Sequence, residues 1–388
     1  MEASKESTGR AALGRLALER KDWRGAAELL STLPPELVTI ENLLDLALAY
    51  RMTGEFTRSI GTLDAALVLE PRNFLALLSK GAVLERCGRH KEAAGTYKNA
   101  LAVAPPEGVL PASLAGPVAR ARDVVRSHAQ ALAAHLRASV ADLRGQFLGE
   151  DLDRFDESLA IYAGVARAHP QEPLLLHYPR LPAIPFYNRE LFPWLAELEA
   201  ATPVLQAELA GAMAAGADEF TPYIAFPPGV PTNQWAALNH SRLWSSFFLW
   251  RDGVRQDVAC ALCPRAAALL TSLPMTNQPG FAPTAMFSVL DAKTSIPPHT
   301  GSANTRLIVH LPLVLPGPAR FRVGAVTRDW KMGEAWVFDD TIEHEAWNEA
   351  DQPRTILIFD IWNPLLSPAE RALVSAMMTA RNAFQATG

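Results

Sequence analysis

The chain has 388 residues, of which 49% are hydrophobic and 20% charged, so it is long enough to bury more than one core. Its formal net charge of -5 argues against a phosphate backbone as partner. The N-terminus lacks the apolar stretch of a signal peptide, and no run is long enough to span a bilayer. We therefore expect a cytoplasmic protein of two domains that binds neither nucleic acid nor membrane.

The first part of the sequence is rich in Ala, Leu, Glu and Arg at helical spacing, and it contains a repeat. An offset of 34 residues, the period of tetratricopeptide helix pairs, relates Gly54, Leu63, Ala66 and Pro71 to Gly88, Tyr97, Ala100 and Pro105. A degenerate unit precedes them at 23–35. Because two to three repeats barely bury a continuous core, we expect the predicted helices at 114–148 and 155–168 to cap the stack.

The amino-acid composition changes near residue 172, where prolines and aromatic residues become frequent. We therefore expect tetratricopeptide-like repeats at 1–110, a helical connector at 111–171 and a second domain at 172–388. Two or three helices, around 190–213 and 254–273, are predicted at its start. Short segments of strand length follow, separated by Gly, Pro, Asn or Asp, at 285–290, 305–315, 320–326, 334–338 and 354–361. Evenly spaced short strands favour a jelly roll or small barrel, so the fold class is α+β.

The three cysteines are too few for a disulfide framework. Cys260 and Cys263 have the spacing of a redox or metal pair, but no second pair or nearby histidine completes a zinc site. We expect reduced cysteines in helices.

Three histidines, His299, His310 and His344, fall in the predicted strand region. Imidazole suits iron(II), and an oxygen-activating site must leave neighbouring coordination positions open. The usual third ligand is a carboxylate two residues after the first histidine, but Gly301 occupies that position. The pattern predicts a metal held by two histidines and water, with partly buried structural histidines as the alternative.

Arg354 stands ten residues after His344 and begins a predicted strand. A guanidinium there can bind a dicarboxylate through two parallel hydrogen bonds, which lysine would not reproduce. This spacing fits a 2-oxoglutarate site. Pairing of Arg354 with Asp360 or Glu349 is the structural alternative.

At these residues the chain resembles the aspartyl/asparaginyl β-hydroxylases, which are iron(II)- and 2-oxoglutarate-dependent oxygenases. The resemblance covers roughly residues 175–370, and its motifs are 244–250, 287–290, 299–311, 338–348 and 360–364. It implies a double-stranded β-helix in which His299 and His344 bind iron without a carboxylate ligand.

The resemblance also implies roles for further residues. Arg354 and Ser288 would hold the distal carboxylate of 2-oxoglutarate, His310 would help with the proximal one, and Trp244 would form a wall of the pocket. For Ser288 and His310, strand positions without a cofactor contact remain alternatives.

Two more roles concern the substrate side. The resemblance implies that Arg306 receives an acidic or amide side chain and that Asp340 acts with metal-bound water. A salt bridge for Arg306 and a turn role for Asp339 and Asp340 stay open. One departure is Ile308, where the animal enzymes carry a second arginine.

The expected reaction is hydroxylation of a C–H bond with dioxygen, giving succinate and carbon dioxide, most simply at the β-carbon of Asp or Asn in a peptide or protein bound by the repeats. A free or carrier-bound amino acid, an acyl chain, a metal enzyme without 2-oxoglutarate and a non-catalytic scaffold are the alternatives.

Overall fold

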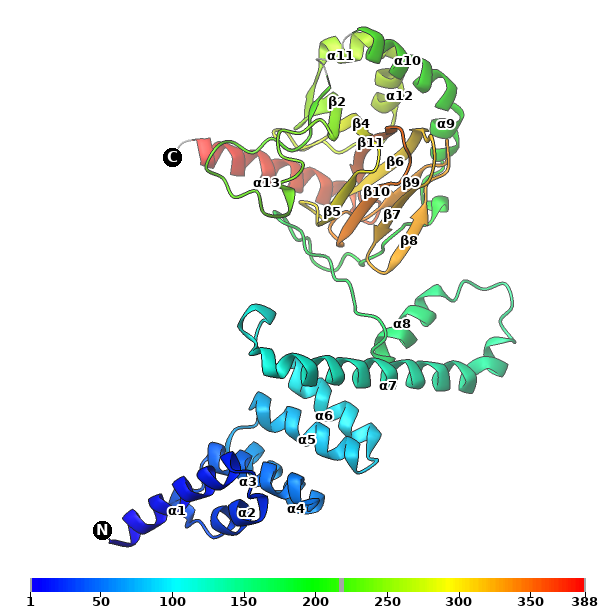
Figure 1. Cartoon of the computed structure of the whole chain (residues 1–388). Coiled ribbons are helices and arrows are strands. Elements are labelled where there is room, and N and C mark those ends of the chain that lie inside the picture. Colours follow the sequence, from blue (N-terminus) through cyan, green and yellow to red (C-terminus); the bar gives the residue numbers. More distant parts are fainter. Residues whose placement is uncertain (1, 216–219, 387–388) are drawn as a thin grey trace. The chain divides into compact units, whose positions relative to one another are not determined.

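A computed structural model describes residues 2–215 and 220–386 of the chain. The chain forms two compact units, Met1–Arg167 and Ala168–Gly388, and the division falls a few residues before the predicted change near residue 172. Figure 1 shows the first as all-helical and the second as a β-sheet domain with flanking helices. None of the described helices combines the length and apolar character needed to cross a bilayer.

The first unit is a row of helices in which each packs on the next. They are α1 (Glu2–Glu19), α2 (Trp23–Ser31), α3 (Ile40–Thr53), α4 (Phe56–Leu69), α5 (Phe74–Arg86), α6 (His90–Ala102), α7 (Ala112–Arg144) and α8 (Asp153–Ala163).

The predicted helix-pair repeat is confirmed by equivalent turns and close contacts. Gly54 ends α3 and Gly88 follows α5, and both have positive φ, 83° and 73°, where glycine is favoured. At Gly81 a Cβ atom would lie 2.5 Å from the Tyr97 ring, so glycine allows α6 to pack closely on α5. Val118 of α7 joins the same core, so α7 covers the end of the repeats.

The second unit contains two antiparallel sheets. The larger has the order β1-β2-β4-β11-β6-β9, with β3 beside β2, and the smaller has the order β5-β10-β7-β8. Their strands are β1 (Thr221–Pro222), β2 (Trp244–Arg251), β3 (Val254–Arg255), β4 (Ala285–Leu290), β5 (Ser295–His299), β6 (Arg306–Val314), β7 (Ala319–Val323), β8 (Val326–Asp329), β9 (Trp336–Phe338), β10 (His344–Asn348) and β11 (Arg354–Trp362). One core, which contains Ile308 and Ile356 of the larger sheet and Phe321 and Ala346 of the smaller, lies between them, as in a jelly roll.

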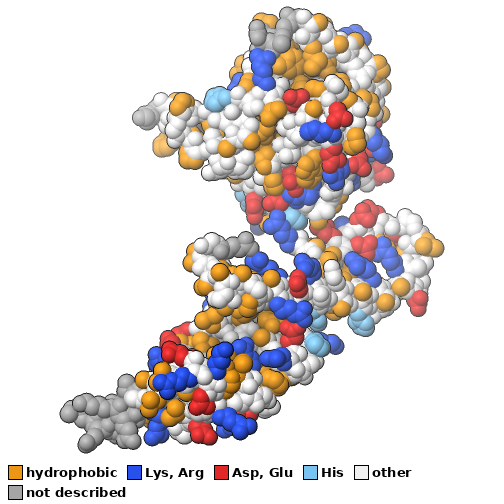
Figure 2. Space-filling model, viewed as in Figure 1, with side chains coloured by type: hydrophobic (Ala, Val, Ile, Leu, Met, Phe, Trp, Pro, Cys, Tyr) orange, Lys and Arg blue, Asp and Glu red, His pale blue; other side chains and the backbone are white. Residues whose placement is uncertain are grey.

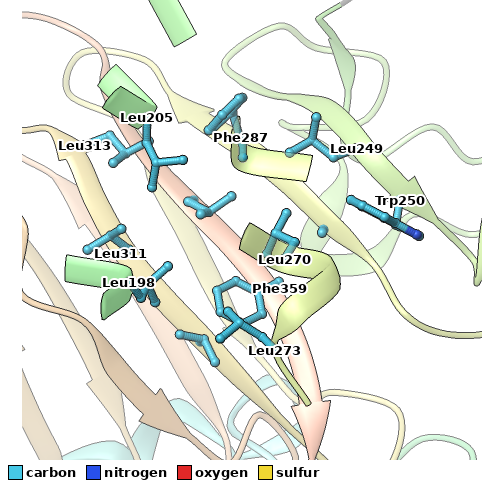
Figure 3. Packing of buried hydrophobic residues seen from close by; sticks show 14 of the residues in the cluster. Leu198, Leu205, Leu249, Trp250, Leu270, Leu273, Phe287, Leu311, Leu313 and Phe359 are labelled. Atoms are coloured by element: carbon cyan, nitrogen blue, oxygen red, sulfur yellow. The ribbon is translucent and has the colours of Figure 1, made fainter. Parts of the chain in front are cut away.

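Helices cover the opposite face of the larger sheet. Figure 3 shows Leu198, Leu205 and Leu270 on these helices packed against Phe287 and Phe359 of the sheet. The helices are α9 (Leu195–Ala200), α10 (Thr202–Ala215), α11 (Asp257–Leu262) and α12 (Pro264–Ser272), and α13 (Pro368–Ala386) ends the unit.

Strand alternation decides which side chains reach the space between the sheets. In β6, Leu307 and Val309 pack under the helices, whereas Ile308 faces the other core. His310 has the same parity as Ile308. In β11, Leu357 and Phe359 lie under the helices, and Arg354 has the opposite parity. The alternation therefore directs His310 and Arg354 between the sheets.

The outer face of the smaller sheet is charged and self-paired. Arg320 of β7 pairs with Glu349, and Arg322 pairs with Glu343 and Glu345. Figure 2 shows acidic and basic side chains intermixed over the part of the second unit where Figure 1 places β7, β8 and β10. This face of the sheet is therefore solvated, and the apolar side chains of its strands point inward.

Candidate active site

A cavity of about 330 Å³ opens between the two sheets. Its walls bring together the two predicted metal ligands, His299 and His344, with Arg354, His310 and Arg306, which come from the two sequence segments 299–310 and 344–354. Most of the remaining lining is aromatic or aliphatic: Tyr223, Trp235, Trp244, Phe281, Met286, Ile296, Ile308, Phe321, Phe338, Ala346, Ile358 and Phe359. A few polar groups thus converge in a largely apolar space, as is usual for ligand sites.

His299 and His344 are direct neighbours across the smaller sheet. They form a residue pair between the end of β5 and the start of β10, and their ring centroids are 4.0 Å apart. Each ring is oriented by its own backbone: Nδ1 of His299 lies 2.8 Å from the carbonyl oxygen of Pro297, and Nδ1 of His344 lies 3.0 Å from that of Ile342. Since a carbonyl oxygen only accepts, both Nδ1 atoms donate, which leaves Nε2 with its lone pair.

Burial keeps both rings neutral. It lowers the pKa of His299, and it lowers that of His344 well below the ordinary value, with the neighbouring His299 adding to the effect. Neutral imidazoles are the protonation state that a metal ion requires.

Gly301 stands where the usual third ligand would be, and the space beside it is occupied by the carboxyl group of Asp340. A Cβ atom at Gly301 would lie 2.0 Å from Oδ2 of Asp340, so no side chain fits there while Asp340 keeps its place. The amide of Gly301 donates to the carbonyl of Asp340 at 2.6 Å. Oδ1 of Asp340 is buried without a hydrogen-bond partner, and burial raises the pKa of this carboxyl to about 7. Within residues 2–215 and 220–386, no three His, Cys, Asp or Glu side chains form a metal-binding group.

Arg354 is a buried cation that makes few polar contacts with the described residues of the protein. Its side chain is only 1% exposed, its Nη1 donates to the Ser288 carbonyl at 3.3 Å, and its Nε has no partner. The guanidinium carbon lies 4.9 Å from the centre of the Trp330 ring. Burial lowers the pKa of Arg354 to about 9. The alternative that Arg354 pairs with Asp360 fails, because Asp360 binds Arg306 instead.

His310, Ser288 and Trp244 lie around this guanidinium. Nδ1 of His310 is buried without a partner, and burial together with the charge of Arg354 lowers the pKa of this ring well below its ordinary value. The Trp244 indole donates to the Ser288 hydroxyl at 3.0 Å. Trp244 and His310 line the cavity, whereas Ser288 reaches it only through its contacts with Trp244 and Arg354. The Arg354 guanidinium and the His310 ring are therefore two neighbouring buried groups that can donate hydrogen bonds into the cavity.

Arg306 has partners that the sequence did not reveal. Its Nη1 lies 2.6 Å from Oδ2 of Asp360, and its Nη2 lies 3.2 Å from Oδ2 of Asp340. Burial alone would lower the pKa of Arg306, but the two carboxylates raise it above the ordinary value. Asp339, by contrast, accepts from the amide and hydroxyl of Thr341 and serves the turn.

Sequence reasoning missed several residues of the site. Trp235 packs edge-on against His299 with centroids 4.9 Å apart, and Tyr223 lies 4.2 Å from the Trp244 ring. Both come from irregular segments, which give no periodic signal. Asp360 could have been predicted to face the space between the sheets, because it lies six residues after Arg354 in the same strand and an even spacing places both side chains on one face.

Comparisons with known proteins identify the family to which the chain is similar. The family described as Aspartyl/Asparaginyl beta-hydroxylase matches residues 213–364. An ornithine lipid ester-linked acyl 2-hydroxylase of Rhizobium tropici is 34% identical over 201 residues, which are 51% of this chain and 67% of that protein. The human aspartyl/asparaginyl beta-hydroxylase is 37% identical over 135 residues, or 34% of this chain and 18% of that enzyme. The chain belongs to the aspartyl/asparaginyl β-hydroxylase family, and the similarity supports an enzyme of the hydroxylase class.

The helical unit was also compared with solved structures. The Arabidopsis OM64 TPR domain is 21% identical and covers 31% of this chain and 95% of its own, with a TM-score of 0.27. The TPR2B domain of yeast Sti1 is 16% identical and covers 31% of this chain and 98% of its own, with a TM-score of 0.28. The helix-pair repeat itself rests on the turns and contacts described above.

Proposed function

We propose that the second unit is an iron(II)- and 2-oxoglutarate-dependent dioxygenase that hydroxylates a C–H bond. In the overall reaction, a substrate C–H becomes C–OH, and 2-oxoglutarate loses carbon dioxide and becomes succinate. The alcohol and succinate each receive one atom of dioxygen, and the carbon dioxide comes from the carboxylate that 2-oxoglutarate loses. The observation that carries the proposal is the cavity between the sheets. It joins two neutral, backbone-oriented imidazoles to a buried guanidinium that has no carboxylate partner among residues 2–215 and 220–386.

The residues present fit an iron(II) ion. His299 and His344 would be its protein ligands through Nε2, and the hydrogen bonds of their Nδ1 atoms fix the ring orientations. Asp340 has an unpartnered buried oxygen beside them and would accept a hydrogen bond from metal-bound water. When bound, iron(II) would activate dioxygen, which no protein side chain does alone.

The residues on the other side of the cavity fit a dicarboxylate. Arg354 would bind the distal carboxylate of 2-oxoglutarate, because a buried cation without a counter-ion is stabilised by an anion that brings its own charge. His310 would donate to the proximal carboxylate through its unpartnered ring nitrogen. Trp244 and Ser288 hold each other beside this site and would close it against water.

The two named relatives differ in what their names say they act on, an ornithine-lipid acyl group and aspartyl or asparaginyl residues. Either kind of substrate is compatible with C–H hydroxylation in this cavity. The helical unit has a separate hollow of about 520 Å³ whose lining includes Arg51, Arg86, Arg120 and Tyr97. We place the docking of a peptide or protein that carries the substrate group there. Arg86→Glu should then raise KM for such a macromolecular substrate and leave the turnover of a small one unchanged.

The decisive experiment follows succinate release from 2-oxoglutarate with iron(II), without any added substrate, in the wild type and in His344→Ala. Enzymes of this kind decarboxylate 2-oxoglutarate slowly when no substrate is present, so the wild type should release succinate and the variant should not. Arg320→Ala, on the solvated face of the smaller sheet, is a matched control and should behave as the wild type. Equal background in the wild type and His344→Ala would remove the proposal.

A further inference from the structure

The charge of Arg306 is already matched within the protein. Asp360, which is fully buried, holds its Nη1 at 2.6 Å, and Asp340 holds its Nη2 at 3.2 Å. Asp360 is itself fixed by the Thr276 hydroxyl at 2.8 Å and the Thr284 amide at 3.1 Å. Breaking the pair would leave a buried carboxylate without its cation, which is strongly destabilising. Arg306 is therefore a counter-ion of the protein and is not free to receive a substrate carboxylate.

The rest of the cavity does not supply a replacement cation. Among its described lining residues, the charged side chains are Asp252, Arg306, Asp340 and Arg354. Arg354 is committed to 2-oxoglutarate in the proposed function, and Asp252 adds a negative charge. Ile308, two residues after Arg306 on the same face of β6, presents an aliphatic side chain to the cavity.

The walls next to the two histidines are apolar as well. Trp235 packs on His299, and Ile296, three residues before that histidine on β5, lines the cavity together with Ile308. A carboxylate brought into this space would lose its hydration and gain no cation, while the carboxylates of Asp340 and Asp360 would repel it.

We propose that the cavity selects a substrate that is uncharged at the group next to the reacting carbon, such as an amide or an acyl chain, and that it rejects a free carboxylate. Ile308 is the specificity-determining residue, because it lines the cavity with an uncharged side chain while Arg306 is already paired with Asp360 and Asp340. This inference rests on the proposed function and narrows it: aspartate side chains are excluded, whereas asparagine side chains and acyl groups are not.

The test uses two matched pairs of probes with iron(II) and 2-oxoglutarate. One pair is a peptide with Asn or Asp at its centre, and the other is dodecanamide or dodecanoate. Oxygen incorporation is followed by mass spectrometry and kcat/KM is compared within each pair. We expect the uncharged member of at least one pair to be hydroxylated, and to exceed its charged partner at least tenfold. The pair that responds distinguishes an amide side chain from an acyl chain.

Ile308→Arg provides the converse test, with Ile308→Met as a control of similar length without charge. The arginine variant should raise kcat/KM for the charged probes at least tenfold, and the methionine variant should not. Equal or better use of the charged members by the wild type would overturn the proposal, and so would background-only signals with all four probes. Failure of the proposed function is recognised separately, because the wild type would then release no succinate even without a probe.

Discussion

Replacing Arg354 with methionine should make the ligand-free protein more stable while abolishing its response to 2-oxoglutarate. The guanidinium is buried, and its pKa is lowered to about 9 by that burial. Each tenfold change in proton affinity corresponds to about 1.4 kcal/mol, so the displacement from arginine's ordinary range represents roughly 4 to 5 kcal/mol. The hydrogen bond to the Ser288 carbonyl and the contact with the face of Trp330 offset about 1 to 2 kcal/mol of this burial cost.

The net cost of keeping this cation buried is therefore on the order of 3 kcal/mol. Methionine fills similar space without charge, so Arg354→Met should raise the free energy of unfolding of the metal-free second unit by about 1 to 3 kcal/mol. In the wild type with metal, 2-oxoglutarate at a hundred times its Kd should add about 2.7 kcal/mol, and in the variant it should add nothing.

Urea unfolding followed by tryptophan fluorescence is the suitable assay, because every tryptophan except Trp23 belongs to the second unit. Arg320→Met, at an exposed arginine of the same unit, should change stability by less than about 0.5 kcal/mol. A destabilised Arg354→Met protein, or one that still responds to 2-oxoglutarate, would refute the view that this guanidinium is kept for an anionic cosubstrate.

Three further substitutions test other parts of the structure. Gly301→Ala places a Cβ atom against Asp340 and should lower the free energy of unfolding by about 1 to 3 kcal/mol in urea titrations; an unchanged value would contradict the close contact. Glu85→Gln removes the partner of Arg120, whose hydrogen bond lowers the pKa of Glu85. The stabilisation by Glu85 is present above the ordinary glutamate pKa and is lost on acidification, so the loss of about 0.5 kcal/mol at pH 7 should vanish below about pH 3 when circular dichroism follows unfolding. Leu63→Ala should cost the helical unit about 2 to 5 kcal/mol in the same assay, and a loss below about 1 kcal/mol would mean that the repeat core is not formed as described.

The strands whose bounds were predicted most closely are those buried on both faces. β4, β6 and β11 are nearly continuous apolar runs ended by turn residues, and the structure places them within a residue or so of the expected bounds. β5 was not predicted, because Pro297 and Pro298 argue against a strand. The structure tolerates them because β5 lies at the edge of its sheet and its register with β10 shifts between Ile296 and His299, where the two prolines stand.

β2, β10 and α13 were also not predicted as elements. β10 alternates the buried His344, Ala346 and Asn348 with the half-buried Glu345 and Trp347, so only one of its faces is fully buried and no apolar run marks it in the sequence. Its identity as a strand depends on pairing with β5 and β7, which are not adjacent to it in the sequence. Local patterns do not contain such pairings.

The candidate site likewise has residues that local sequence patterns identify and contacts that depend on strand pairing. The motifs around His299, His344 and Arg354 identify which residues matter, because their chemical types suit a metal and a dicarboxylate. The partners of Arg306 could not be read in this way, since Asp360 comes next to it only through the register of β6 and β11. That register gives Arg306 the salt bridge that was its structural alternative, and its role toward the substrate stays a prediction.

The most direct test is an anaerobic titration of the protein with iron(II), first alone and then with 2-oxoglutarate, followed by calorimetry. We predict that the wild type binds one iron(II) per chain and that His299→Ala and His344→Ala lose this binding. Arg354→Met should still bind iron(II) but no longer bind 2-oxoglutarate. Iron binding of equal strength in the wild type and both histidine variants would contradict this prediction.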